Sequence, residues 1–492
     1  MNKKITILPG TPDDDNREYL PEIIRTTDVV VNENGNNSQV YPARLAENKG
    51  VIADGLEDIW YEYVPESYDP AKKTPLVFSM HGGLMTGWGQ AIYTCWTMVA
   101  DREGFIVVFP NANSRRFWVV ECDEETYAER SKPRPDGVYL NPFPENPDDN
   151  HDMKAVLGLI DLMKSKYNID EGRIFMQGMS MGNLMTHQFA RYFGNVLAGA
   201  AGAGGPSDLG VIFDKNGNIN NRAGHLAVWQ SRPELNEFLN PRSELEKNRL
   251  NKEYWLKING CKALPQISIQ GENNYAFYTG DKADLVFLDI KNRDHGQTLD
   301  DAELVWDYLF SGTRREPDGR IVHSETIAPR TGDEFAIAIA KDCKKAWFKN
   351  SVTDMSGRAI LWQKLKYHGL EGGQEVRGEY LCVPLSFIAE VFEAKYQPSE
   401  DSLTAVLILK DGRELQFARG SIGCVIDNRI SAMLCEALHR SGELYISFEW
   451  FCRYFYNLHV SVFDDVLYVT DHYNVLSMNM AYLINGILKD NG

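Results

Sequence analysis

The sequence has no long apolar run, few cysteines and a deficit of basic residues. No stretch of about 18 consecutive apolar residues occurs, so no transmembrane helix or membrane insertion is expected. Its eight cysteines form no Cys-x-x-Cys pair, which gives no support to a zinc site. In a chain of 492 residues they are too sparse for a disulfide scaffold, so we expect mostly buried free thiols. A few disulfides remain an alternative if the protein is exported, and we expect no metal and no other cofactor.

The scarcity of positive charge limits the choice of partner. Lys and Arg number 51 against 69 Asp and Glu, which gives a formal net charge of −18. Nucleic acids and anionic membrane surfaces attract basic proteins, so we expect neither as the main partner. The N-terminus is basic at Met1–Lys4, but Pro9 and Gly10 follow before any apolar segment, so no secretory signal is predicted. The compartment stays open: cytoplasmic as the chain is written, or exported if a leader is missing.

Residues 46–312 alternate between short apolar runs and segments with helical spacing. Runs such as 76–80 and 105–109 are typical of strands buried on both faces of a parallel sheet. The alternation predicts an α/β domain with a doubly wound, mostly parallel sheet. Further strands are expected at 59–64 (an edge strand), 173–177, 226–230, 267–270 and 285–290, helices at 90–103, 151–167, 181–193 and 300–310, and a polar excursion at 205–250.

The two ends of the chain differ from this domain. Residues 1–45 form a polar arm, and residues 313–334 are charged and contain proline, as expected of a linker. Residues 335–492 predict a second, smaller α+β domain with a weak internal repeat. Segments 380–396 and 444–460 each have the pattern of a strand, an amphipathic helix and a second strand.

The central chemical signal is the pentapeptide Gly178-Met-Ser-Met-Gly182. A predicted strand precedes it and a predicted helix follows it, which is the context that the Gly-x-Ser-x-Gly nucleophile turn requires. The two glycines leave room for a tight turn that lifts Ser180 clear of the sheet. Ser180 is therefore the predicted nucleophile.

Two backbone N–H groups and one histidine complete the expected machinery. His81-Gly82-Gly83 follows the strand at 76–80, where an oxyanion donor is expected, so we assign that role to Gly83 and Met181. A plain glycine turn is the alternative. A serine hydroxyl needs a general base, and His295 has the required place on a loop after the last strands.

The third member of the triad should be an acid that follows a strand and precedes His295. The strand at 226–230 runs on through residues 231–233 into Glu234, which is the preferred choice, with Glu272 and Asp294 as rivals. The set predicts two-step acyl transfer. Ser180 attacks an ester carbonyl while His295 takes its proton, and water then releases the acid.

At these motifs the sequence resembles the esterases grouped with poly(3-hydroxybutyrate) depolymerases and with feruloyl and acetylxylan esterases. The resemblance covers residues 58–310 and rests on LVFSMHGG, FIVVFPNA, RIFMQGMSMGN, VWQSRPE, YWLKINGC and DHGQ in this order. It implies the α/β-hydrolase fold and places Glu234 on the family's acid. Asn183 departs from the family, which has a glycine there, and Gln230-Ser231 replaces a His-Gly pair.

Residues 375–470 resemble the copper amine oxidase N-terminal-like domain, a repeat module of exported proteins. The resemblance rests on the two repeat units, of which Val383–Glu390 (VPLSFIAE) is the clearer. The family's name does not imply a copper site or oxidase chemistry in this chain. The resemblance implies an accessory or anchoring module with contact to a cell wall or glycan, and an exported setting.

The sequence therefore predicts a serine carboxylic ester hydrolase that acts on acyl esters of plant polysaccharide or on small aryl esters. The alternatives are a serine peptidase and a catalytically degenerate hydrolase domain that binds carbohydrate or cell wall. Among the tryptophans, Trp88 lies closest behind the 81–83 turn and is the expected substrate contact. Trp96, Trp118 and Trp229 are more typical of a core.

Overall fold

The computed structural model describes residues 5–7, 18, 21–28, 40–113, 116–133, 135, 137–234, 244–293, 295–368 and 373–490. The chain divides into two compact units. The first contains residues 1–265 and 275–331, and the second contains residues 266–274 and 332–492. Within the described ranges, no helix combines the length and the apolar character needed to cross a membrane.

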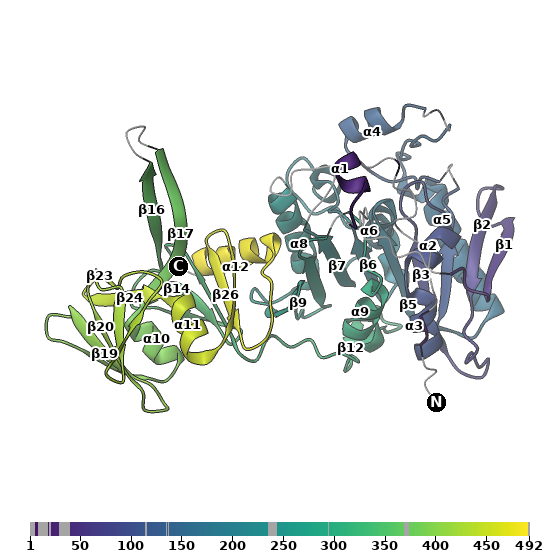
Figure 1. The fold of residues 1–492 in the computed structure, drawn as a ribbon. Coiled ribbons are helices and arrows are strands. Elements are labelled where there is room, and N and C mark those ends of the chain that lie inside the picture. Colours follow the sequence, from purple (N-terminus) through teal and green to yellow (C-terminus); the bar gives the residue numbers. More distant parts are fainter. Residues whose placement is uncertain are drawn as a thin grey trace. The chain divides into compact units, whose positions relative to one another are not determined.

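The first unit is built on a large mixed sheet (Figure 1). Its strands follow the order β1-β2-β4-β3-β5-β6-β7-β10-β9. All neighbours from β4 to β10 are parallel, while β2 runs antiparallel to both β1 and β4. The predicted α/β-hydrolase fold is thereby confirmed. The strands are β1 Leu45–Val51, β2 Glu57–Tyr63, β3 Thr74–Met80, β4 Ile106–Pro110, β5 Ile169–Met179, β6 Gly199–Ala203, β7 Ala227–Pro233, β9 Asn273–Tyr278 and β10 Leu285–Ile290.

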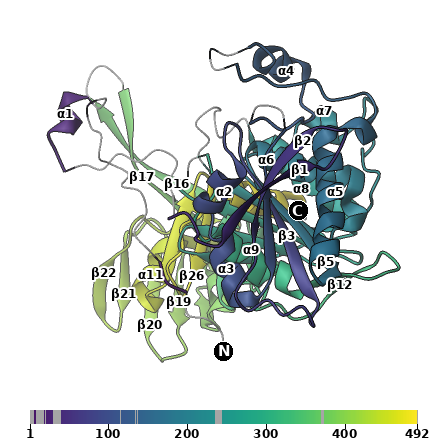
Figure 2. The same cartoon turned by 90° about the vertical axis from the view of Figure 1, so that its right-hand side faces the viewer.

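Helices cover both faces of this sheet, which is why β3 and β4 are buried at every position. Figure 2 shows α3 and α5 on opposite sides of β1, β2 and β3. On the face of α3 and α9, Trp306 stacks on Phe105, and Phe175 stacks on Phe310. The helices are α1 Glu22–Arg25, α2 Gly87–Tyr93, α3 Trp96–Glu103, α4 Glu124–Arg130, α5 His151–Lys166, α6 Met181–Phe193, α7 Leu209–Ile212, α8 Leu245–Asn259 and α9 Asp301–Tyr308.

Several predicted elements differ from the observed ones. The helix expected at 90–103 is two helices, because Thr94 is extended between α2 and α3. The strand expected at the edge is β2, which lies inside because β1 pairs with its outer side. Part of the polar excursion, from Leu245, is the start of α8.

Strand β6 was not predicted, because its sequence GAAGA has neither a large apolar residue nor a β-branched one. It is nevertheless buried throughout. Large side chains have no room there: a Cβ on Gly202 would lie 1.8 Å from the Oδ1 atom of Asn183 on α6. The strand is composed of small residues because α6 packs directly on it.

The expected linker is also partly folded. Residues 313–331 belong to the first unit and contain the paired strands β11 (Thr313–Arg315) and β12 (Ile321–His323). The buried Arg315 side chain donates to the carbonyl oxygens of Leu197, Gly194 and His225. This anchors the segment to the first unit, and residues 266–274 in turn group with the second unit.

The second unit contains three small sheets with the orders β15-β14-β13-β26-β25, β16-β17-β24-β23 and β18-β19-β20-β21-β22. Both expected strand–helix–strand repeats are present, as β17-α10-β18 and β24-α11-β25. Figure 1 shows the β16–β17 hairpin extending away from α10 and α11. The elements are β8 Gln266–Gln270, β13 Ala336–Ala340, β14 Lys345–Phe348, β15 Ser351–Asp354, β16 Ile360–His368, β17 Gly373–Pro384, α10 Leu385–Val391, β18 Lys395–Pro398, β19 Thr404–Ile408, β20 Glu414–Ala418, β21 Gly423–Ile426, β22 Arg429–Ala432, β23 Leu438–Arg440, β24 Glu443–Ser447, α11 Phe448–Tyr456, β25 His459–Phe463, β26 Val466–Thr470 and α12 Met478–Asp490.

Candidate active site

Ser180 occupies a strained turn between β5 and α6. Its backbone has φ 54° and ψ −116°, a conformation that residues other than glycine rarely adopt. The turn is held by a hydrogen bond in which the Ser180 N–H donates to the Ala203 carbonyl at 2.8 Å. Strain of this kind persists only where the surrounding structure imposes it, and here it turns the chain from strand into helix within one residue.

The two glycines of the motif are sterically required. A Cβ on Gly178 would lie 2.1 Å from the carbonyl oxygen of Gly182. A Cβ on Gly182 would lie 2.1 Å from the carbonyl oxygen of Met80, at the end of β3. Any larger residue at either position would push α6 away from the sheet and displace Ser180.

His295 meets this serine from the loop after β10. The Nε2 atom of His295 lies 2.9 Å from the Oγ atom of Ser180. For the hydroxyl to donate to Nε2, the imidazole must carry its proton on Nδ1, which is the tautomer that a general base uses. The structure therefore brings together the predicted nucleophile and the predicted base.

Gly204 lies against both Ser180 and His295. It was not singled out in the sequence. It follows β6 with φ +82°, and a Cβ there would lie 3.3 Å from the backbone nitrogen of Ser180. The same Cβ would lie 3.5 Å from the Cε1 atom of His295. The signal for it was the glycine pair after β6, which is recognisable only once β6 is known to be a strand.

Glu234 lies at the end of β7 and is only 5% exposed. Its carboxylate accepts a hydrogen bond from Lys291 Nζ at 2.9 Å and a longer one, of 3.4 Å, from the Asn292 N–H. Both donors belong to the loop that carries His295. Of the rival acids, Glu272 belongs to the second unit and Asp294 lies outside the described residues.

Gly83, one of the proposed oxyanion donors, lies against the side chain of Met181, the other. A Cβ on Gly83 would lie 3.0 Å from the Sδ atom of Met181 and 3.1 Å from the Phe117 ring. The backbone at Gly83 therefore passes close to the side chains of Met181 and Phe117. Adjacent thioether and aromatic groups give this side of the site an apolar lining.

The neighbouring His81 is a structural residue. Its Nε2 accepts from the Ala112 N–H at 3.0 Å, and its Nδ1 lies 2.7 Å from the carbonyl oxygen of Gly82, to which it donates in the matching tautomer. Burial lowers the pKa of His81 to about 4, so the ring is neutral near pH 7. It holds the 81–83 turn and is not placed to act as a base for Ser180.

Asp152 anchors the loop that carries Phe117 and was not predicted. Its buried carboxylate accepts from the backbone N–H groups of Val119 at 2.7 Å and Asn113 at 3.2 Å. In the same loop, the indole of Trp118 donates to the His81 carbonyl at 2.8 Å. The available signal was an acidic residue in the first turn of the helix predicted at 151–167.

The tryptophans separate into exposed and buried ones. Trp88, at the start of α2, is 41% exposed and lies 6.5 Å from the Tyr41 ring. Its role as a substrate contact stays a prediction. Trp96, Trp118 and Trp229 are all buried, as expected of core residues.

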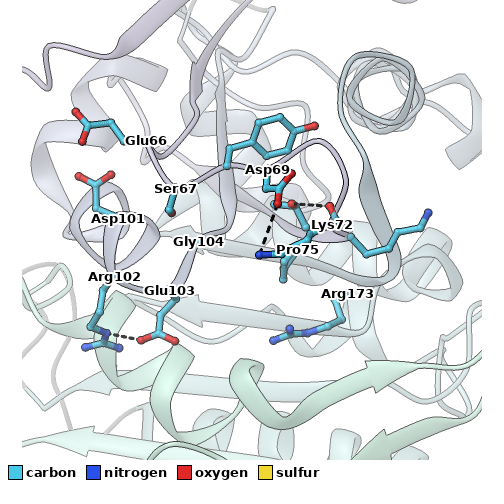
Figure 3. A pocket seen from close by; sticks show the side chains of 13 residues that line it. Glu66, Ser67, Asp69, Lys72, Pro75, Asp101, Arg102, Glu103, Gly104 and Arg173 are labelled. Atoms are coloured by element: carbon cyan, nitrogen blue, oxygen red, sulfur yellow. Dashed lines mark hydrogen bonds and ion pairs between the residues drawn. The ribbon is translucent and has the colours of Figure 1, made fainter. Parts of the chain in front are cut away.

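A separate pocket of about 800 Å³ lies near the amino-terminal end of β3, away from the end of β5 that leads to Ser180 (Figure 3). It is lined by Thr74 and Pro75 at the start of β3 and by Arg173 early in β5, whereas Ser180 follows the end of β5. Its charged groups already have partners: Arg102, for example, pairs with Glu103 at 2.6 Å. Among the residues that the structure describes, no cluster of His, Cys, Asp and Glu is suited to hold a metal ion.

About a third of the chain is similar in sequence to curated esterases and a depolymerase. It is 28% identical over 150 residues to the bifunctional acetylxylan esterase/xylanase XynS20E of Neocallimastix patriciarum, covering 30% of this chain and 18% of that protein. It is 29% identical over 178 residues to poly(3-hydroxyalkanoate) depolymerase C of Paucimonas lemoignei, covering 35% and 36%. Feruloyl esterase B of Neurospora crassa is 26% identical over 148 residues, covering 29% and 43%.

The matched part of this chain thus spans less than half the length of these curated relatives. No protein-family model matches the chain. Among solved structures, an acetyl xylan esterase from Aspergillus awamori covers 54% of this chain and 98% of its own, with a TM-score of 0.39 and 16% identity.

Proposed function

We propose that this chain is a serine carboxylic ester hydrolase. The observation that carries the proposal is the 2.9 Å contact between Ser180 Oγ and His295 Nε2 at a strained strand-to-helix turn. A serine hydroxyl is a weak nucleophile near neutral pH unless a base accepts its proton. Nucleophile and base are already within hydrogen-bonding distance here.

The reaction proceeds in two balanced steps. Ser180 Oγ bonds to the ester carbonyl carbon while its proton passes to His295, and the imidazolium then protonates the departing alcohol. Water next gives a proton to His295 and attacks the acyl-enzyme, which releases the carboxylic acid and restores the serine. The backbone N–H groups of Gly83 and Met181 stabilise the oxyanion in both steps.

Glu234 is proposed as the acid that orients His295. It follows β7, the strand parallel to the one that leads to the His295 loop, and it is buried against that loop. Its contacts with Lys291 and Asn292 hold the first two residues of the loop in place. Glu234→Gln is expected to lower kcat strongly, because the amide cannot stabilise an imidazolium as a carboxylate does.

The substrate is proposed to be an acyl ester of plant polysaccharide or a small aryl ester. Support comes from the relatives named as acetylxylan and feruloyl esterases. The departure from the family at Asn183 is accommodated, since its Nδ2 donates to the Gly205 carbonyl at 2.6 Å. The altered residue therefore braces the segment after β6 and leaves the nucleophile turn intact.

The test is hydrolysis of an ester panel by the wild type and Ser180→Ala. The panel contains p-nitrophenyl acetate, p-nitrophenyl butyrate, methyl ferulate and acetylated xylan. We expect turnover to fall by at least about 10³-fold in Ser180→Ala and to be unchanged in Ser165→Ala, an exposed serine on α5. A folded wild type that hydrolyses no ester, and whose Ser180 does not react with a fluorophosphonate, would overturn the proposal.

A further inference from the structure

Two of the eight cysteines, Cys382 and Cys435, bring their sulfur atoms together in the second unit. The Sγ atoms are 3.6 Å apart, although the residues are 53 positions apart in the sequence. Both side chains are buried, at 0% and 1% exposure. All eight cysteines lie in described parts of the chain, and this is the one pair among them with sulfur atoms in contact.

The backbone on both sides of this contact is fixed by hydrogen bonds. Cys382 lies on β17, which pairs with β24. Cys435 lies just before β23, which pairs with the other edge of β24. Its segment is held because Met433 and Ala437 donate their N–H groups to carbonyls of residues 421–422. The backbone hydrogen bonds therefore hold the two cysteine residues close to each other.

The surroundings of the pair are apolar. Tyr445 completes a small buried cluster with the two cysteines, and Trp362 and Tyr380 pack against it. A thiolate metal site needs further ligands, and no suitable group of His, Cys, Asp and Glu occurs in the described residues. Two thiols in contact without other ligands have a simpler chemistry open to them.

We propose that Cys382 and Cys435 form a disulfide bond when the chain folds in the presence of a small-molecule disulfide such as oxidised glutathione. One cysteine thiolate attacks the glutathione disulfide and releases one glutathione thiolate, which leaves a mixed disulfide. The second cysteine attacks this intermediate and releases the other glutathione. Two protein thiols are oxidised, one small disulfide is reduced to two thiols, and the two protons end on the released glutathione.

The geometry asks for little movement. A disulfide is about 2.05 Å long, so the sulfurs must approach by about 1.5 Å, which side-chain rotation can supply. The bond would close a loop that contains α10 and the whole sheet from β18 to β22. It would join the two points where the chain enters and leaves that sheet, which restricts the unfolded state and stabilises the second unit. Such a bond persists in an oxidising compartment, which is the setting that the resemblance of residues 375–470 implies.

The full chain is the material for the test. It is unfolded with reductant, refolded in a buffer of oxidised and reduced glutathione or of reduced glutathione alone, and alkylated with iodoacetamide in denaturant. We expect two of the eight thiols to be protected only in the oxidising buffer. Peptide mass spectrometry should find residues 382 and 435 joined, about 2 Da lighter than the two thiols. The melting temperature of the oxidised form should be higher by roughly 5–10 °C.

Matched variants make the result specific. Cys382→Ser and Cys435→Ser should each lose the protected pair, whereas Cys424→Ser, a buried cysteine with no sulfur neighbour, should keep it. If refolding of the whole chain fails, the natively purified protein is equilibrated in the same two buffers. Folded protein whose eight thiols are all alkylated after the oxidising treatment overturns the proposal, as does protection of any other pair.

Discussion

The two units bury different kinds of side chain. In the first unit His81, His187, Arg232 and Lys252 are all buried. In the described part of the second unit no His, Lys or Arg is buried, and Asp333 is the one buried charged residue. Burying a charged or titratable group carries a desolvation penalty. The comparison shows that the first unit accepts this penalty at several positions, while the described core of the second unit is almost entirely apolar or uncharged.

The largest effect that would sharpen the comparison is expected at Gly204. Gly204→Ala would place a methyl group against the Ser180 nitrogen and the His295 ring, so we expect kcat to fall by about 10²-fold or more. Gly224→Ala is the matched control, because Gly224 has a similar φ of +87° but open space around it. Both variants should lose similar stability, and only Gly204→Ala should lose activity in steady-state ester hydrolysis. Equal activities would show that Gly204 does not limit the site.

In the second unit the largest expected effect is on stability. Asp333 accepts hydrogen bonds from Ser268 Oγ at 2.7 Å, the Ile269 N–H at 3.0 Å and the Tyr468 hydroxyl at 2.8 Å. Asp333→Ala would leave three donors without their acceptor, so we expect a loss of about 3 kcal/mol in the free energy of unfolding. Urea unfolding measures it, with the exposed Asp354→Ala as control. Ester turnover should be unchanged; a parallel loss of kcat would break the separation of roles between the units.

Acid should destabilise the first unit through His187. Burial lowers the pKa of His187 to about 3, with a smaller contribution from Arg232 and Arg191. The folded state holds the ring neutral, so its contribution is complete above the unfolded pKa of about 6.5 and is lost as pH falls toward the folded value. Between pH 7 and 4.5 we expect the wild type to lose about 2–3 kcal/mol more than His187→Leu.

The measurement is urea unfolding of both proteins at the two pH values. His459→Leu, at an exposed position on β25 of the second unit, is the control and should follow the wild type at both. If His187→Leu shows the same pH dependence as the wild type, His187 takes up its proton equally in the folded and unfolded states. Its burial then does not explain the acid sensitivity of the first unit.

Sequence reasoning located the elements with clear periodicity and the residues next to them. The strand at 285–290 and the helix at 181–193 were predicted with the observed bounds, and the structure brings Ser180 and His295 together. Local patterns suffice there, because a buried strand is continuously apolar and a nucleophile turn needs its glycines.

The missed features depend on tertiary contacts. Strand β6 is made of glycine and alanine because α6 packs on it, and no local pattern reveals that packing. Arg315 appeared to be a linker charge, yet its side chain donates to four carbonyl oxygens of the first unit. Asp152 and Gly204 act on segments distant in the sequence, so their functions follow only from the fold.

The smallest expected effect concerns substrate binding by exposed aromatic side chains. Trp88 in the first unit is 41% exposed and Tyr454 on α11 in the second is 55% exposed. If Trp88 stacks on the substrate, Trp88→Ala should raise KM for methyl ferulate by about 3–10-fold with little change in kcat, since binding to ground and transition states is lost equally. Tyr454→Ala should leave the kinetics of this small ester unchanged.

Acetylated xylan then discriminates between the units. A polysaccharide is long enough to contact residues well away from the nucleophile, so a second unit that binds glycan should make Tyr454→Ala raise KM for the polymer alone. If Tyr454→Ala has no effect on either substrate while Trp88→Ala affects both, recognition around these two aromatics belongs to the first unit. If Trp88→Ala affects neither, the exposed indole has no part in substrate binding, and the apolar lining formed by Met181 and Phe117 becomes the next place to look for acyl recognition.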